Sequence, residues 1–246
     1  MVSVARGGRF YGIDGCPGGW VAASSSGDFP GVTFGLVADL ELAAFLAGLE
    51  GSGAVVAIDV PIGLAECEPR ACDGAARGRL GVPRQNSVFS APCRGTLAAL
   101  DYVGACVINR SLRGQAISRQ SWNIVPKIAA VDAVLEELPG LAEQIWEVHP
   151  EVTFAELAGT LNGLKAAKKS ADGQRLRLKL LAAHGLTLDV DEIRATLQTA
   201  KVRRDDIVDA AACLLTARRI ARGEAIFLPP GQAPRDARGR RMQIAA

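Results

Sequence analysis

The hydrophobic positions of this chain fall into short runs that follow a strand pattern in its first part. Residues 9–23 contain two apolar runs joined by a turn rich in glycine and proline, which predicts a β-hairpin. A turn at 28–31 and an apolar run at 31–37 predict a third strand. Residues 54–58 are apolar without alternation, which is typical of a parallel strand covered on both faces.

Helical patterns dominate the rest of the chain. Apolar residues recur at helical spacing in 39–49, 119–138, 173–183, 191–199 and 205–222. A further strand is predicted at 144–148, and the tail predicts a last edge strand or a surface flap. Residues 66–138 begin with short helical runs broken by glycine and proline, with a long loop at 81–95 that is typical of a functional lid. We therefore expect one α/β domain over 1–246 with a helical insertion at about 66–138.

Composition narrows the class of protein. The chain has 246 residues, 49% of them hydrophobic, which is enough for a full core. No apolar run reaches the roughly 18 to 20 residues that cross a bilayer, and the first ten residues lack the apolar core of a signal peptide. The six cysteines lack metal-binding spacing, and Cys67 and Cys72 are their only close pair. We expect a cytoplasmic protein with free thiols and no membrane partner.

Positive charge is concentrated in one part of the chain. The net charge is only +2, but residues 70–127 contain eight arginines and one lysine against two aspartates, a local charge of +7. Such a stretch indicates a polyanion site, and the alternative is a solvated surface. The residues that we expect to contact phosphate are Arg84, Arg94 and Arg119, joined by Lys168 and Lys169 from a later loop.

Four aspartates stand in apolar or helix-end settings. Asp14 ends the first apolar run and Asp59 follows the buried strand, while Asp206 and Asp209 are three residues apart on one helix. Capping of that helix explains Asp206, but Asp209 precedes Ala-Ala-Ala-Cys-Leu-Leu, and a buried charge needs a cation or several donors. If both strand aspartates face the helix, the four acids converge. All-oxygen ligands suit Mg²⁺ or Mn²⁺, and two such ions can cleave phosphodiesters.

The segment EVHPE adds two candidate residues. Glu147 ends the predicted strand at 144–148, where it can serve as a further catalytic ligand or select the substrate. His149 can act as a base, a ligand or a substrate contact, and the alternative is a strand-end histidine bonded to backbone.

These motifs resemble RNase H-like nucleases. GIDG, AIDVPIGL and DDIVDAAACLLTA occur in the order found in RuvC-type Holliday junction resolvases. In more detail the chain resembles a family catalogued as a domain of unknown function and described as predicted RNase H-like nucleases. That likeness rests on GIDGCPGGW, DVPIGL, an RxCDxxAR-type segment, SVFSAP, EVHPE and DDIVDA, and it runs from Tyr11 to about Ala217.

The resemblance implies a mixed five-stranded sheet flanked by helices and a nuclease acting on DNA or RNA. By it, Asp14, Asp59, Asp206 and Asp209 match the resolvase metal ligands, with the departure that resolvases usually carry glutamate at the position of Asp59. Junction resolvases act as symmetric dimers, so it also implies a homodimer. Two alternatives stay open: an ATPase- or kinase-like protein acting on a small phosphorylated or nucleotide substrate, and a non-catalytic nucleic-acid-binding protein.

Overall fold

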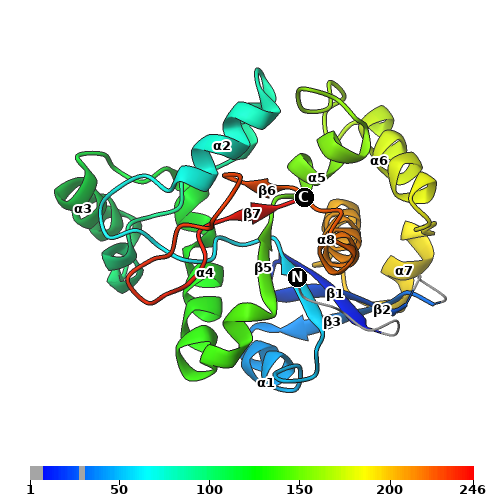
Figure 1. Ribbon diagram of the computed structural model, residues 1–246, viewed down its shortest axis with the longest axis horizontal. Coiled ribbons are helices and arrows are strands. Elements are labelled where there is room, and N and C mark those ends of the chain that lie inside the picture. Colours follow the sequence, from blue (N-terminus) through cyan, green and yellow to red (C-terminus); the bar gives the residue numbers. More distant parts are fainter. Residues whose placement is uncertain (1–7, 28–30) are drawn as a thin grey trace.

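A mixed sheet of seven strands forms the centre of the molecule in the computed structural model, which describes residues 8–27 and 31–246 (Figure 1). The strands are β1 (Arg9–Cys16), β2 (Gly19–Ser26), β3 (Thr33–Ala38), β4 (Val55–Ile58), β5 (Ile145–Val148), β6 (Phe227–Leu228) and β7 (Ile244–Ala245). Their order is β3-β2-β1-β4-β5-β7-β6. β1, β4, β5 and β7 run parallel, and β2, β3 and β6 are antiparallel to their neighbours. The predicted hairpin and buried parallel strand are confirmed, and residues 28–30 of the predicted turn lie outside the described residues.

The predicted number of strands was wrong, because the tail adds two. β7 lies between β5 and β6, so the C-terminal segment supplies an interior strand and not only an edge strand or flap. β6 is an edge strand, as one reading of the tail expected, whereas the interior strand β7 spans two residues, which is too short for an apolar pattern to identify from the sequence. Ala246 is fully buried beside them.

The helices largely follow the predicted ranges. They are α1 (Leu42–Ala47), α2 (Ala71–Leu80), α3 (Tyr102–Arg113), α4 (Arg119–Glu137), α5 (Pro150–Leu157), α6 (Ala171–Ala183), α7 (Val190–Thr196) and α8 (Arg204–Arg222), with short 3₁₀ turns η1 (Asp39–Glu41), η2 (Arg84–Ser87), η3 (Arg94–Ala98) and η4 (Pro139–Glu143). The helix predicted at 39–49 is therefore shorter and begins as a 3₁₀ turn. None of the helices in the described ranges has the length and apolarity needed to cross a bilayer.

Helices cover both faces of the sheet (Figure 1). On one face α1 and α4 pack against Trp20, Val56 and Ile58 of the sheet. On the other face α8 and its neighbours α5, α6 and α7 pack against residues such as Val21 and Ala57. Two helices of the predicted insertion differ in position. α4 belongs to the core on the face that α1 covers, while α3 lies at the far end of the molecule from α7 (Figure 1).

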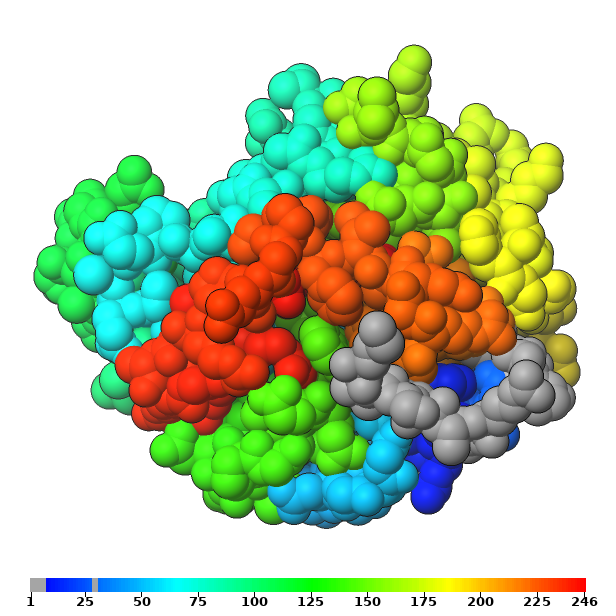
Figure 2. Space-filling view, viewed as in Figure 1, coloured from blue at the N-terminus to red at the C-terminus, as the bar shows by residue number. Residues whose placement is uncertain are grey.

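The C-terminal segment closes one side of the α4 layer (Figure 2, red). Arg240 forms ion pairs with Asp132 and Glu136 of α4, and Asp236 accepts a hydrogen bond from the backbone of Leu64 at 3.0 Å. These contacts hold the segment in place as it approaches β7.

The closest approach between helix and sheet occurs at Gly12 in β1. A Cβ atom built there would overlap the backbone carbonyl of Ala210 and the backbone amide of Leu214 in α8. We predict that Gly12→Ala lowers the free energy of unfolding by about 3 kcal/mol or more, because neither backbone can yield. Urea denaturation checks this. Gly35→Ala in β3, where the added methyl meets nothing, is the matched control and should change stability by less than about 0.5 kcal/mol; equal effects of the two variants would contradict the prediction.

Candidate metal centre

Three aspartates from three elements converge at one edge of the sheet. Asp14 lies near the end of β1, Asp59 directly follows β4, and Asp209 lies in α8. The parallel register pairs Ile13 with Ile58, and the amide of Asp59 donates to the carbonyl of Ile13 at 2.9 Å, so the two strand aspartates are neighbours. One carboxylate oxygen from each aspartate lies within 4.8 Å of the other two. Asp14 and Asp209 are buried, and Asp59 is partly buried.

One lysine supplies positive charge to this cluster. Lys168, from the segment between α5 and α6, forms an ion pair with Asp209. Burial and the neighbouring acids Asp209 and Asp59 raise the pKa of Asp14 well above its ordinary value. Burial raises the pKa of Asp209 to about 7, although Lys168 acts to lower it. The pKa of Asp59 is also raised by burial, against the opposing effect of His149 and Lys168. A single ammonium therefore does not offset the cost of placing three carboxylates together.

The cluster has the features of a divalent-cation site. Oδ1 of Asp209 is buried and has no hydrogen-bond partner among the described residues, although a buried carboxylate oxygen without a partner is costly. Its neighbours in the cluster are also carboxylates, and hard oxygen donors suit Mg²⁺ and Mn²⁺. Asp14, Asp59 and Asp209 therefore fit such an ion.

Asp206, the fourth predicted metal ligand, lies outside the group of three. Its carboxylate accepts a hydrogen bond from the backbone amide of Arg203 at 2.8 Å and so caps the first turn of α8. Burial raises its pKa. Asp206 lines the same cavity as the cluster, together with Asp205.

Glu147 belongs to a second buried group. Both of its carboxylate oxygens accept hydrogen bonds from Arg70, at 2.6 and 2.8 Å, and one also accepts from the amide of Ile62 at 2.8 Å. Arg70 also pairs with Asp73, whose second oxygen accepts from the amide of Ala91 at 3.0 Å. Glu147 is thus fully engaged in holding β5 to the segment before α2. Glu147 also lines the cavity of the cluster, and its catalytic role stays a prediction.

His149 and Glu151 both line the cavity of the cluster. Nε2 of His149 is 3.2 Å from the carbonyl oxygen of Ser87, as in the backbone-bonded alternative, whereas Nδ1 is buried without a partner among the described residues. Nη2 of Arg177 donates to both carboxylate oxygens of Glu151, at the start of α5, at 2.7 Å, and Nε donates to one of them at 3.0 Å. The motif EVHPE therefore contributes two acids paired with arginines and one histidine with a free ring nitrogen.

The other predicted phosphate contacts separate into two sets. Lys168 and Lys169 line the cavity of the cluster. Arg84, by contrast, donates to the carbonyl oxygens of Leu164 and Lys165, at 2.7 and 2.6 Å. Arg94 pairs with Asp132 and Asp236, and the guanidinium of Arg119 lies 3.8 Å from the ring centroid of Tyr102. None of these three arginines lines the cavity.

The cavity that contains the cluster has a volume of about 690 Å³. Its walls combine acids and bases with apolar side chains such as Trp20, Ile124 and Phe89. Lys127 also lines it, where the ammonium lies 4.4 Å from the ring centroid of Trp20 and pairs with Asp39.

Sequence reasoning assigned no role to Arg70 or Arg177. The signal that could have found them is the pair of glutamates in EVHPE, because buried carboxylates need cationic partners.

Comparison with known proteins identifies one family. A family model described as "Protein of unknown function (DUF429)" matches residues 12–233. No curated protein and no solved structure matches the chain.

The raised pKa of Asp209 gives a testable pH dependence. Between its ordinary value of 3.8 and about 7, the folded protein holds a proton that the unfolded chain releases, so metal-free stability must fall as pH rises through this window. We expect Asp209→Asn to flatten the loss of stability between pH 5 and pH 8, as measured by thermal melting in EDTA. Asp205→Asn, one turn earlier in α8, is the control and should keep the wild-type slope. If the melting temperatures of wild type and Asp209→Asn fell equally steeply with pH, the raised pKa of Asp209 would be contradicted.

Proposed function

This chain belongs to the DUF429 family, and we propose that it is a metal-dependent hydrolase that cleaves phosphodiester bonds of nucleic acid. In this proposal Asp14, Asp59 and Asp209 hold Mg²⁺ or Mn²⁺. The observation that carries it is the convergence of three largely buried carboxylates from separate elements, one of them with an oxygen that lacks any partner among the described residues. Such a group is costly unless it binds a cation.

The arrangement of the sheet supports the RNase H-like part of the proposal. Strands β3-β2-β1-β4-β5 form a mixed five-stranded unit of the kind that the resemblance implies, and β7 and β6 extend it at one edge. Asp14 lies near the end of β1 and Asp59 directly follows β4. Asp209 lies on α8, which packs against both of these strands. Ligands of open α/β sheets bind beyond the carboxyl ends of the strands, which is where this cluster lies.

The chemistry divides between the ion and the protein. A bound divalent ion would supply Lewis-acid stabilisation of the phosphoryl oxygens and lower the pKa of a water molecule. The carboxylates bind and orient the ion, and the ammonium of Lys168 stands beside Asp209, where it can meet a phosphate oxygen. His149 lines the cavity, and its buried Nδ1 has no protein partner among the described residues, so we assign His149 the role of proton acceptor.

A second candidate function is hydrolysis of a small phosphorylated compound at the same cluster. It is favoured by the contacts of the basic stretch, since Arg84 and Arg94 bind protein carbonyl and carboxylate oxygens and are not directed at a polyanion. Small phosphodiesters and oligonucleotides should therefore be assayed in parallel.

The function is tested by cleavage and by metal-dependent stability. We predict cleavage of labelled oligonucleotides with Mg²⁺ or Mn²⁺ and none in EDTA, together with a rise in melting temperature on metal addition, because only the folded state presents the cluster. Asp14→Asn and Asp209→Asn should lower the cleavage rate by more than about a hundredfold and abolish the stabilisation by metal. Asp205→Asn should retain both. Full cleavage and an unchanged metal response in Asp209→Asn would refute the assignment, and cleavage of only bis(p-nitrophenyl) phosphate would favour the second candidate.

A further inference from the structure

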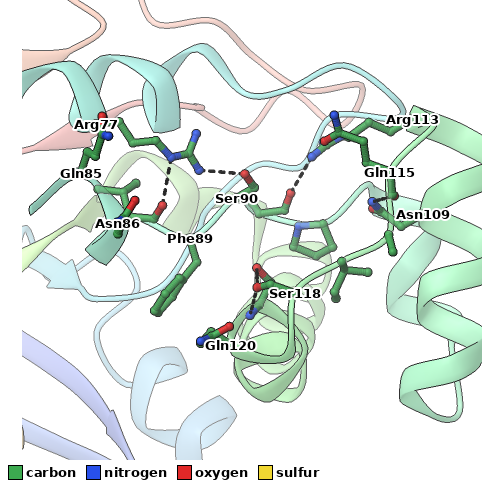
Figure 3. A pocket seen from close by; sticks show the side chains of 16 residues that line it. Arg77, Gln85, Asn86, Phe89, Ser90, Asn109, Arg113, Gln115, Ser118 and Gln120 are labelled. Carbon is green, nitrogen blue, oxygen red and sulfur yellow. Dashed lines mark hydrogen bonds between the residues drawn. The ribbon is translucent and has the colours of Figure 1, made fainter. Parts of the chain in front are cut away.

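A second cavity, of about 370 Å³ (Figure 3), shares lining residues with the cavity of the aspartate cluster. Val88 and Phe89 line both cavities, so the segment between α2 and η3 forms their common wall. A volume of this size is at the lower end of the roughly 300–1,000 Å³ range of ligand pockets. The second cavity therefore has room for one small ligand and not for a folded partner.

The lining of this cavity differs in charge from that of the first. It contains no aspartate or glutamate, whereas Arg77 and Arg113 both line it. The remaining polar groups are mainly amides and hydroxyls, with amides from Gln85, Asn86, Asn109, Gln115 and Gln120. Side chains that offer a donor and an acceptor together, without formal charge, match the edges of nucleobases.

Several lining residues are fixed and others are free. Arg77 donates to the carbonyl of Val88 at 3.0 Å and to Ser90 Oγ at 2.8 Å, and Arg113 donates to the carbonyl of Ala91 at 3.1 Å (Figure 3). Asn109 is likewise bonded to the backbone of Gln115 and Cys93. These bonds hold the shared wall rigid. The side-chain amides of Gln85, Asn86, Gln115 and Gln120 show no hydrogen-bond partner within residues 8–27 and 31–246, so they are available to a ligand.

Phe89 stands where the two cavities meet. Phe89 is 40% exposed, although it lies on a wall that the arginines hold in place. Figure 3 shows Phe89 and Gln120 toward one end of the second cavity, with Arg113 and Gln115 at the other. An exposed aromatic ring beside free amides, with two guanidinium groups that have no carboxylate partner within residues 8–27 and 31–246, is the combination that binds a single-stranded nucleotide, because the base stacks on the ring and its edge meets the amides.

We infer that this second cavity binds one unpaired nucleotide of a single-stranded nucleic acid, next to the phosphodiester that lies at Asp14, Asp59 and Asp209. The inference rests on the proposed function and specifies its substrate as single-stranded. The base stacks on Phe89 and its edge bonds to amides such as Gln120. Arg77 and Arg113 donate to protein oxygens, so they hold the wall and act on the backbone only through their charge. A base inside a duplex has its edge paired and its faces stacked, so it cannot make these contacts.

Binding in the absence of metal tests this inference. Fluorescence anisotropy would measure the affinity of a labelled single strand of about 12 nucleotides, as DNA and as RNA, and of its duplex, in EDTA across a salt series. We expect the single strand to bind more tightly than the duplex. Phe89→Ala should weaken single-strand binding about tenfold or more, while Phe89→Tyr, which keeps a ring, should restore it. The slope of affinity against salt should not change in Phe89→Ala, because no phosphate contact is lost.

Leu100→Ala is the matched control, since Leu100 is an exposed apolar residue (99%) that lines neither cavity, and it should bind as wild type does. Wild-type affinity in Phe89→Ala, or equal affinity for strand and duplex, would overturn the inference, and cleavage by the aspartate cluster would still support the proposed function. Conversely, Phe89-dependent binding of single strands by a protein that cleaves no phosphodiester with Mg²⁺ or Mn²⁺ would overturn the proposed function and leave this nucleotide site standing.

Discussion

The contact between β1 and α8 at Gly12 determines where the acids of this protein meet. Because Gly12 has no side chain, the backbone of α8 approaches the strand so closely that a methyl group would not fit. The side chains from Ala210 to Ala212 are small and fully buried, so no bulky side chain separates this part of α8 from its neighbours. Asp209 directly precedes this contact on the helix, and Asp14 lies two residues beyond it on the strand. Their separation is therefore set by backbone packing and not by a flexible loop, which is the rigidity that a preorganised site needs.

Charge is distributed unevenly around this contact. Glu147 and Glu151, on the walls, each accept hydrogen bonds from two nitrogens of a buried arginine, and both oxygens of each carboxylate are satisfied. The central group of Asp14, Asp59 and Asp209 has one ammonium, from Lys168, whose side chain is 34% exposed. The protein thus neutralises its structural acids with its own arginines and leaves the centre short of positive charge. That difference separates the acids that build the cavity from those that can bind an ion.

The order of apolar and polar residues along the chain predicted those elements that neighbouring residues determine. The apolar strand at 54–58, the hairpin and α8 were predictable from the sequence, and the presence of aspartates within apolar runs identified all three members of the cluster. The expected polyanion contacts of Arg84, Arg94 and Arg119 rested on a charge count. A count cannot tell whether a guanidinium faces solvent, a carbonyl oxygen or an aromatic ring, and here these arginines bind within the protein. The tail contains the edge strand β6, as one of the two readings of the tail expected, but the interior strand β7 was missed because its pairing is long-range and its two residues carry no pattern.

The central claim, that Asp14, Asp59 and Asp209 bind a divalent cation, is tested most directly by a crystal structure of the protein soaked in Mn²⁺. Anomalous scattering from manganese would locate the ion without reference to any activity. The account predicts an anomalous peak within coordination distance of carboxylate oxygens from all three aspartates, including Oδ1 of Asp209, with the ammonium of Lys168 displaced from its ion pair. Fully ordered aspartates with Lys168 still paired to Asp209, and no anomalous peak among them at millimolar Mn²⁺, would contradict it.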